Sequence, residues 1–371
     1  MKVLHLIAGA RPNFMKIAPV YRELSTYPDR YLPRIIHTGQ HYDEKMSELF
    51  FNDLGMPQPF AYLDVGSGTH GQQTARIIER YEDLILKGER PDLVVVAGDV
   101  NSTIACALVA KKLNIPVAHL EAGLRSYDEQ MPEEINRILT DRISDLLLTP
   151  SPDADENLIS EGVCRDKIFL VGNIMIDSLV EHLKKAEKST ILKDLGFRKD
   201  EPYMLVTLHR PSNVDSHESL TMLLQALGEI SQHLKLIFPI HPRTRKNIAK
   251  LSLGSILENA PGLIVTEPLG YLDFLKLETK ATLILTDSGG IQEESTYLGI
   301  PCLTLRENTE RPITITEGTN QLIKLDYISI VKAVQEILDG NVKQGSVPKL
   351  WDGKTAERVV KLFEDWFNKN R

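Results

Sequence analysis

Short apolar runs alternate with longer segments of helical periodicity along most of the chain. A run such as 93–97 is apolar at every position, which is typical of a parallel strand covered by helices on both faces. Segments such as 74–86 and 133–145 carry apolar residues three and four positions apart, which predicts amphipathic helices. The predicted strands are 3–8, 32–38, 93–97, 117–121, 146–149, 168–171, 204–208, 236–240, 263–266, 282–286, 301–305 and 321–324.

The alternation starts afresh after Gly172-Asn173, and 371 residues are too many for one ordinary core. We therefore predict an α/β fold with two doubly wound, Rossmann-like domains facing a cleft, over residues 1–172 and 173–352. An amphipathic segment, 353–371, should form a C-terminal helix that packs back onto the first domain. Ligands of doubly wound sheets bind at the carboxyl ends of the strands, so chemistry is expected there.

Net charge, apolar run lengths and cysteine positions limit the kinds of partner, location and bound metal that the sequence allows. A net charge of −8 argues against nucleic acid or an anionic membrane surface as the main partner. The apolar opening run is too short for a signal peptide, and no run approaches membrane-spanning length, which predicts a cytoplasmic protein. Cys106, Cys164 and Cys302 are far apart, and each is interpreted as a small core residue rather than part of a disulfide or zinc site.

Charged side chains recur at the predicted strand ends of the first domain. One such residue would be an ordinary helix cap or a surface pair, but their repetition at most strand ends is poorly explained by capping. Glu133 and Arg137 are four positions apart and should share one helix face. The candidates are Arg11 and Lys16, Asp99, Glu121 and Arg125, and Glu133 with Arg137.

The second domain offers a nucleotide site. Ser288, Gly289 and Gly290 join a predicted strand to a helix, where backbone N–H groups and the helix dipole would bind a diphosphate. Glu294, one turn on, could accept hydrogen bonds from ribose hydroxyls. Phe274 is equally suited to stacking on a base or to the core.

Three further candidates complete this half of the chain. His209 and His241 end two strands, and Arg311 follows a later one. The chain has no GxGxxG motif and no P-loop, which disfavours nicotinamide chemistry and phosphoryl transfer. No metal-ligand spacing is present, so neither a metal nor another cofactor is predicted.

Taken in order, seven motifs resemble those of the non-hydrolysing UDP-N-acetylglucosamine 2-epimerases. They span nearly the whole chain and read GARPNFMKIAP, GDVNST, HLEAGLRS, PEEINR, TLHR, LTDSGGIQEE and TERP. The resemblance implies a GT-B-like fold, a homodimer and no external cofactor. It also implies reversible inversion at C2 of UDP-GlcNAc to give UDP-ManNAc, by anti elimination of UDP and its re-addition.

The resemblance also implies residue roles. Asp99, Glu121, Glu133 and His209 match the family's catalytic residues. The remaining positions match substrate contacts, and we add His241 from its place at a strand end: Arg11, Lys16, Arg137, Phe274, Ser288, Gly289, Gly290, Glu294 and Arg311.

Some features depart from the family. Asn13 and Pro211-Ser212 stand where Glu and Arg-Glu are frequent. Many bacterial members bind a second UDP-GlcNAc as activator through a Gln-His-Arg stretch. Here Gln40 and His41 are followed by Asp43, so conversion of UDP-ManNAc is expected without added UDP-GlcNAc.

Several alternative functions stay open at this point. They are 2-epimerisation of UDP-GalNAc or of a UDP-2,3-diacetamido-uronate, hydrolytic epimerisation, glycosyl transfer by a GT-B enzyme, and sugar-nucleotide binding without turnover. The acid-rich first domain argues against an inverting glycosyltransferase, which needs fewer carboxylates.

Overall fold

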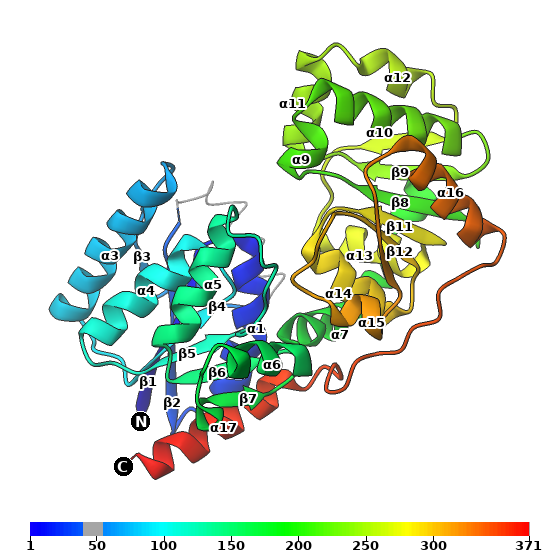
Figure 1. Cartoon of the computed structure of the whole chain (residues 1–371). Helices are drawn as coiled ribbons and strands as arrows, with labels where there is room; N and C mark the ends of the chain where they lie inside the picture. The colour runs from blue at the N-terminus through cyan, green and yellow to red at the C-terminus, as the bar shows by residue number, and fades with distance from the viewer. Residues whose placement is uncertain (40–54, 371) are drawn as a thin grey trace. The chain divides into compact units, whose positions relative to one another are not determined.

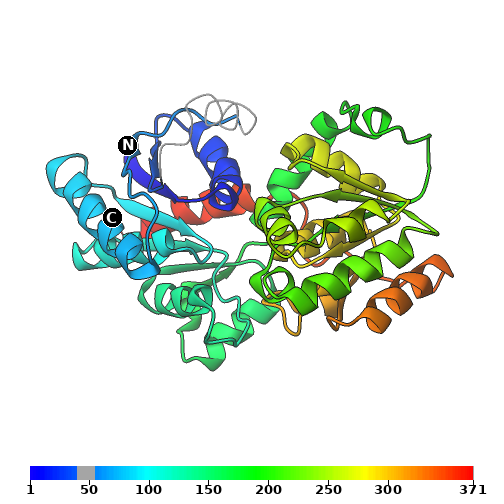
Figure 2. The same ribbon diagram turned by 90° about the horizontal axis from the view of Figure 1, so that it is seen from above.

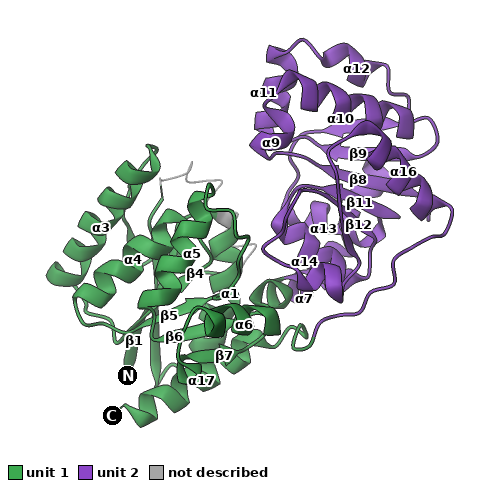
Figure 3. Ribbon diagram, viewed as in Figure 1, with its two compact units in different colours: residues 1–178, 349–371 green, residues 179–348 purple. Residues whose placement is uncertain are grey.

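A computed structural model describes residues 1–39 and 55–370 (Figure 1). The side chain of Arg11 and the activator-site residues Gln40, His41 and Asp43 lie outside the description. The chain divides into two compact units, residues 1–178 with 349–371 and residues 179–348 (Figure 3). The boundary falls inside α7 (Ile174–Ala186), whose first turn belongs to unit 1.

Unit 1 is a parallel sheet with the strand order β3-β2-β1-β4-β5-β6-β7. Its strands are β1 (Lys2–Ala8), β2 (Tyr31–His37), β3 (Ala61–Tyr62), β4 (Leu93–Ala97), β5 (Val117–Leu120), β6 (Leu146–Thr149) and β7 (Ile168–Leu170). Its helices are α1 (Arg11–Ser25), α3 (His70–Lys87), α4 (Asn101–Lys112), α5 (Pro132–Ile143), α6 (Pro152–Ser160), the short 3-10 turn η1 (Arg165–Lys167) and α17 (Thr355–Lys369).

Unit 2 is a second parallel sheet, of order β10-β9-β8-β11-β12-β13. Its strands are β8 (Tyr203–Thr207), β9 (Lys235–Pro239), β10 (Leu263–Thr266), β11 (Leu283–Thr286), β12 (Cys302–Leu305) and β13 (Asn320–Ile323). Its helices are α8 (Ile191–Asp194), α9 (Pro211–Val214), α10 (His217–Ile230), α11 (Pro242–Lys250), α12 (Gly254–Glu258), α13 (Tyr271–Lys280), α14 (Gly289–Leu298), α15 (Ile313–Thr316) and α16 (Tyr327–Leu338).

Helices cover both faces of each sheet, as the continuous apolar strands predict. In unit 2 the stripe Leu220, Leu223 and Leu227 of α10 joins Val334 of α16 in one core cluster against the sheet. On the other face, Leu277 of α13 and Ile291 of α14 belong to a second cluster. All twelve predicted strands are found, and among residues 1–39 and 55–370 only the two-residue β3 was not predicted.

Most predicted strand bounds differ from the observed ones by one residue, and two differences from the prediction have a physical reason. Strand 117–121 ends one residue early, because Glu121 adopts a left-handed φ of 71° and both Glu121 and Ala122 donate to the Leu148 carbonyl. Cys164 is exposed, whereas Cys106 and Cys302 are buried as expected. Its neighbour Val163 packs against the cluster that contains Leu158, and Cys164 itself lies exposed directly before the short turn η1.

The C-terminal helix α17 returns to unit 1 and lies beside α1, red and blue in Figure 2. Val359 and Phe363 on its inner face are fully buried, and Phe367 packs against Tyr31 of β2. Asp177 of α7 accepts the backbone N–H groups of Thr355 at 3.0 Å and Ala356 at 2.7 Å, which caps the start of α17. Burial raises the pKa of Asp177 to about 6, although these hydrogen bonds act in the opposite direction.

The raised pKa predicts a pH-dependent stability. The unfolded carboxyl titrates at its ordinary value of about 3.9, so stability is lost as pH rises from there through the folded pKa. Between about pH 5 and about pH 7.5, the wild type should lose about 1.4 kcal/mol of unfolding free energy relative to Asp177→Asn. Urea unfolding of both proteins at both pH values measures this difference. Parallel pH dependence in the two proteins would contradict the expectation.

Candidate active site

The candidate residues gather where the strand order of each sheet reverses. In unit 1 the reversal lies between β1 and β4, and in unit 2 between β8 and β11. Arg11 begins α1 directly after β1, and Asp99 follows β4. His209 follows β8, and Ser288 follows β11. Such switch points are where doubly wound sheets bind their ligands, because the loops on either side diverge and leave a crevice.

A buried ion pair joins two of the unit 1 candidates. Lys16 Nζ of α1 contacts Glu121 Oε2, and both side chains are less than a tenth exposed. Glu121 holds its left-handed φ of 71°, a conformation that costs free energy in a residue with a Cβ and often marks functional sites. A Cβ on Gly98 would lie 2.7 Å from Lys16 Nζ and 3.2 Å from Glu121 Oε2, so a glycine is needed here.

Asp99 pairs with Arg137, which reaches it from α5. Arg137 Nη2 lies 2.6 Å and Nε 3.1 Å from Asp99 Oδ2, although 38 residues separate them. A further nitrogen of Arg137 contacts the buried Glu134. Arg137 thus links the loop after β4, through Asp99, to Glu134 of its own helix.

Glu133 and Glu134 have different environments despite being adjacent. Glu134 accepts the backbone N–H groups of Ser126 and Tyr127 and the Ser126 hydroxyl, all within 2.8–3.0 Å. Burial alone would raise the pKa of Glu134, but these hydrogen bonds outweigh it and lower the pKa. Glu134 is thus a structural carboxylate, and Glu133 lines the pocket of unit 1.

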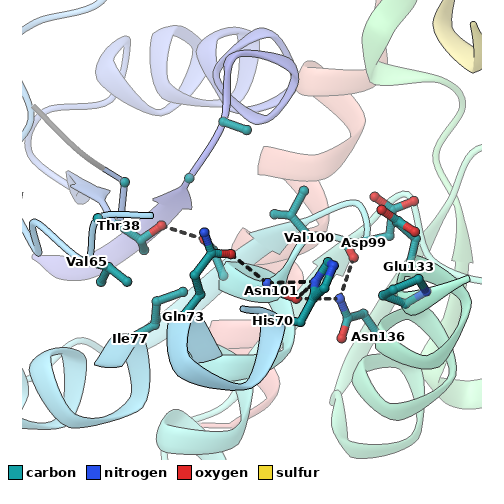
Figure 4. Close-up of a pocket in the computed structure, with 16 residues that line it drawn as sticks. Thr38, Val65, His70, Gln73, Ile77, Asp99, Val100, Asn101, Glu133 and Asn136 are labelled. Atoms are coloured by element: carbon teal, nitrogen blue, oxygen red, sulfur yellow. Dashed lines mark hydrogen bonds between the residues drawn. The ribbon is translucent and has the colours of Figure 1, made fainter. Parts of the chain in front are cut away.

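That pocket has a volume of about 280 Å³ (Figure 4). Asp99 and Glu133 lie at one end of it, and Thr38 and Val65 lie at the other. Amide and imidazole groups line the wall between: Asn101 donates to Gln73 at 3.0 Å, and Asn136 donates to the Asp99 carbonyl at 2.8 Å. Ligand pockets commonly measure roughly 300–1,000 Å³, so this one suits a sugar ring rather than a whole nucleotide sugar.

A buried hydrogen-bond network around His119, which was not predicted, supports the loop that follows β4. His119 of β5 lies with Nδ1 2.6 Å from Asp141 and Nε2 2.8 Å from the Gly98 carbonyl. His119 therefore links Asp141 of α5 to the backbone directly before Asp99. Burial would raise the pKa of Asp141, but His119 and Arg125 together lower it. Arg125, also expected at the site, is instead held by Asp141 and Glu161.

In unit 2, Asp287 organises the loop after β8. Its carboxylate accepts the backbone N–H groups of His209 and Arg210 at 2.9 Å each and lies 2.9 Å from His209 Nδ1. Burial alone would raise the pKa of Asp287, but the His209 ring and these N–H groups lower it. The arrangement fixes Nδ1–H of His209 as a donor, so Nε2 is the nitrogen that can act on a ligand.

His241 lies beside His209 but has a local role. The two rings are 5.4 Å apart, and His241 Nδ1 accepts the Arg243 N–H at the start of α11. Burial and the neighbouring His209 lower the pKa of His241, which favours a neutral ring.

The glycines that open α14 differ in surroundings. A Cβ on Gly289 would lie 2.7 Å from Glu310 Oε1 and 2.8 Å from Arg311 Nη1, whereas no described atom lies within 4 Å of a Cβ on Gly290. The Ser288 side chain does not cap the helix. The start of α14 therefore has open space beside Gly290 and the cation Arg311 beside Gly289, an arrangement suited to an anion.

Arg311 is positioned by two carboxylates. Its Nε lies 2.8 Å from Glu293, and Nη1 contacts Glu310. Phe274 is half-buried and belongs to the apolar packing against Ile291 and Leu277. Glu294 is 4% exposed and accepts the Tyr271 hydroxyl at 2.9 Å.

Sequence reasoning did not find the supporting residues Asp287, His119 and Asp141. Asp287 belongs to the LTDSGGIQEE motif, and its position directly after a predicted strand was the available signal. In the described part of the chain, no three His, Cys, Asp or Glu side chains converge to hold a metal ion. No helix among residues 1–39 and 55–370 is long and apolar enough to span a bilayer.

Comparison with known proteins gives matches over nearly the whole chain. The family model described as UDP-N-acetylglucosamine 2-epimerase matches residues 26–364. A UDP-N-acetylglucosamine 2-epimerase of Methanocaldococcus jannaschii is 46% identical over 365 residues, covering 97% of this chain and 98% of that protein. A UDP-2,3-diacetamido-2,3-dideoxy-D-glucuronate 2-epimerase of Pseudomonas aeruginosa is 42% identical over 367 residues, covering 98% and 99%.

Solved structures of UDP-GlcNAc 2-epimerases superpose on this chain. The crystal structure of the Methanocaldococcus jannaschii UDP-GlcNAc 2-epimerase, in complex with UDP-GlcNAc and UDP, superposes with a TM-score of 0.88 at 45% identity. It covers 98% of this chain and 99% of that one. Together with the two parallel sheets and the returning C-terminal helix, this confirms the predicted α/β, GT-B-like fold class.

Proposed function

Because the chain belongs to the UDP-N-acetylglucosamine 2-epimerase family, we propose that it interconverts UDP-GlcNAc and UDP-ManNAc by inversion at C2. The observation that carries the proposal is the set of carboxylates at the switch point of unit 1, where Asp99 and Glu133 line a pocket sized for a sugar. The Lys16–Glu121 pair is next to Gly98, which directly precedes Asp99. Unit 2 supplies the open start of α14 for the diphosphate.

The chemistry follows from the weak acidity of the C2 proton. One carboxylate removes this proton as UDP departs from C1 on the opposite face, which leaves a C1–C2 double bond. UDP then adds back to C1 while a second group delivers a proton to the other face of C2. Opposite faces need separate acid/base groups, which explains why several carboxylates are required.

Departing UDP carries developing negative charge. We assign its stabilisation to the N-terminus of α14 and to Arg311, with His209 as a further acid/base group in unit 2. Arg11, Lys16 and Arg137 are assigned to the cationic contacts of unit 1, and His241 and Phe274 to the rim of the nucleotide site. Ser288, Gly289 and Gly290 contact the diphosphate, and Glu294 contacts the ribose.

A product assay tests the proposal. The purified protein, given UDP-GlcNAc without acceptor or metal, should yield UDP-ManNAc observable by proton NMR. The same assay with UDP-GalNAc and with UDP-2,3-diacetamido-2,3-dideoxy-glucuronate tests the second candidate, which the 42% identity to the Pseudomonas aeruginosa enzyme favours. Turnover of the uronate alone would reassign the substrate. An unchanged mixture in every case would refute epimerisation.

We also propose that the protein is a homodimer, with α5 at the interface. Ile135, Ile138 and Leu139 of α5 are 50%, 40% and 49% exposed, and their spacing places them on one helix face. Contiguous exposed apolar side chains of this kind mark association surfaces, because covering them removes apolar area from water.

Substitution of this face should change the oligomeric state. Ile138→Asp is expected to convert the dimer to a monomer at micromolar concentration, measured by light scattering coupled to size exclusion. Ile328→Asp is the matched control, because Ile328 is 75% exposed on α16 of unit 2. A monomeric wild type, or an Ile138→Asp variant that stays dimeric, would contradict the assignment.

A further inference from the structure

Glu278 is a fully buried carboxyl group that the proposed reaction does not use. It lies on α13 at 0% exposure, between Leu277 and Thr279. Neither of its oxygens receives a hydrogen bond from a donor group in the described part of the chain. A buried ionised carboxylate without donors is costly, so such a group keeps its proton instead. Burial, together with the neighbouring Glu294, accordingly raises the pKa of Glu278 well above its ordinary value.

The neighbouring ionisable group is the carboxyl of Glu294 on α14, which α13 approaches closely: Tyr271 of α13 donates to Glu294 at 2.9 Å, and Leu277 beside Glu278 shares a core cluster with Ile291 of α14. Two carboxyl groups can share a hydrogen bond only if one of them carries a proton, because ionised carboxylates have no donor. Glu294 already accepts the Tyr271 hydroxyl at 2.9 Å and keeps a small exposed edge of 4%, whereas Glu278 has none. Burial raises the pKa of Glu294 as well, but hydrogen bonds from Tyr271 and Glu278 lower it, so Glu294 is the carboxyl that holds the negative charge. The proton therefore belongs to Glu278.

We propose that Glu278 is a positioning residue for ribose recognition, whose carboxylic acid O–H donates to Glu294 and fixes the orientation of that carboxylate. The inference rests on the proposed function, in which Glu294 accepts hydrogen bonds from the ribose of UDP. Tyr271 and Glu278 donate to it from within the protein, and its remaining lone pairs then point in a set direction. A carboxylate held in this way discriminates a ribose from a 2′-deoxyribose, because only the ribose presents two vicinal hydroxyls.

The packing around the pair supports a rigid arrangement. Tyr271 makes an edge-to-face contact with His182, with ring centroids 5.4 Å apart, which restrains the donor of the first hydrogen bond. The thiol of Cys302 on β12 is the next ionisable neighbour of Glu278. Burial raises the pKa of this thiol to about 11, so it adds no negative charge near Glu278. Glu294 is thus the one ionised group that faces Glu278 among these neighbours.

Binding of two nucleotides tests the inference. The wild type should bind UDP more tightly than 2′-deoxy-UDP in calorimetry. Glu278→Gln keeps a donor of similar shape and should retain this preference within about twofold, whereas Glu278→Met fills the volume without a donor and should lose roughly tenfold of it. Glu294→Ala should abolish the preference.

The outcomes separate the inference from the proposed function. An unchanged preference in a folded Glu278→Met, with loss in Glu294→Ala, would overturn the inference and leave the ribose site intact. An unchanged preference in Glu294→Ala would overturn both. Infrared difference spectra of the wild type against Glu278→Gln at about pH 8 give a check that does not need the methionine variant. The carbonyl band of a protonated carboxyl group should be present in the wild type and absent from the variant, and its absence from the wild type would refute the protonated state.

Discussion

In D₂O, the epimerised product should carry deuterium at C2 after every turnover. The carboxylate that removes the C2 proton on one face exchanges it with solvent, and a different group delivers the new proton to the other face. Small amounts of UDP and of the glycal 2-acetamidoglucal should also leak from the enzyme. Proton NMR of the product measures the loss of the C2 signal, and a fully protiated product would exclude elimination and re-addition.

Amide variants of the three carboxylates should each lower kcat by roughly a hundredfold or more, the scale of a general acid/base group. Asp99→Asn, Glu121→Gln and Glu133→Gln keep the size of the side chain but remove the proton acceptor. The affinity for UDP should change little, because the proposed diphosphate and ribose contacts belong to unit 2. Kinetics and calorimetry on the same preparations separate the two effects.

A matched control comes from the neighbour of Glu133. Glu134→Gln should lower the stability of unit 1, since it weakens the contacts to Ser126, Tyr127 and Arg137. Its kcat should fall less than that of Glu133→Gln. Full activity in all three carboxylate variants would leave the mechanism possible and refute the assignment of residues.

The second large effect concerns the two glycines that begin α14. Gly290→Ala should leave stability unchanged or raise it by up to about 1 kcal/mol, because alanine favours the helix and its methyl group meets no described atom within 4 Å. The same methyl group would occupy the open space where the diphosphate approaches the backbone. We therefore expect UDP affinity to fall by roughly tenfold or more.

Gly289→Ala is the informative partner variant. Its Cβ would lie 2.7 Å from Glu310 and 2.8 Å from Arg311, so the buried ion pairs must shift. Strain of this kind costs about 1–3 kcal/mol, and both stability and UDP affinity should fall. Thermal unfolding and calorimetry distinguish the two variants. If Gly290→Ala binds UDP with wild-type affinity, the diphosphate does not bind at the start of α14.

Much of the fold was accessible from local pattern. Strands buried on both faces have continuous apolar runs, so β4, and β6 with its three leucines before Thr149, were predicted with their observed bounds. The restart of the pattern after Gly172 indicated a second sheet. Polar residues directly after strands were expected to converge, because parallel strands end at one edge of the sheet. The structure places Asp99, His209 and Ser288 at such edges.

The ion-pair partner of each charged side chain could not be predicted from the sequence, because the two members of a pair are distant along the chain. Lys16 meets Glu121 across 105 positions, and Arg137 turns from its helix neighbours toward Asp99. The sequence shows Glu133 and Glu134 as equivalent, but the position of the Ser126 loop buries one and leaves the other in the pocket.

Hydrophobic periodicity and short motifs were enough to predict two parallel sheets, the positions of their strands and the residue types at the strand ends. Packing of distant segments sets which glycine of α14 faces open space and the left-handed φ with which Glu121 leaves its strand. It also buries Glu278 completely on α13, the helix whose Tyr271 donates to Glu294. Burial and hydrogen-bond partners are properties of the folded neighbourhood, and they set the charge that each carboxyl group carries.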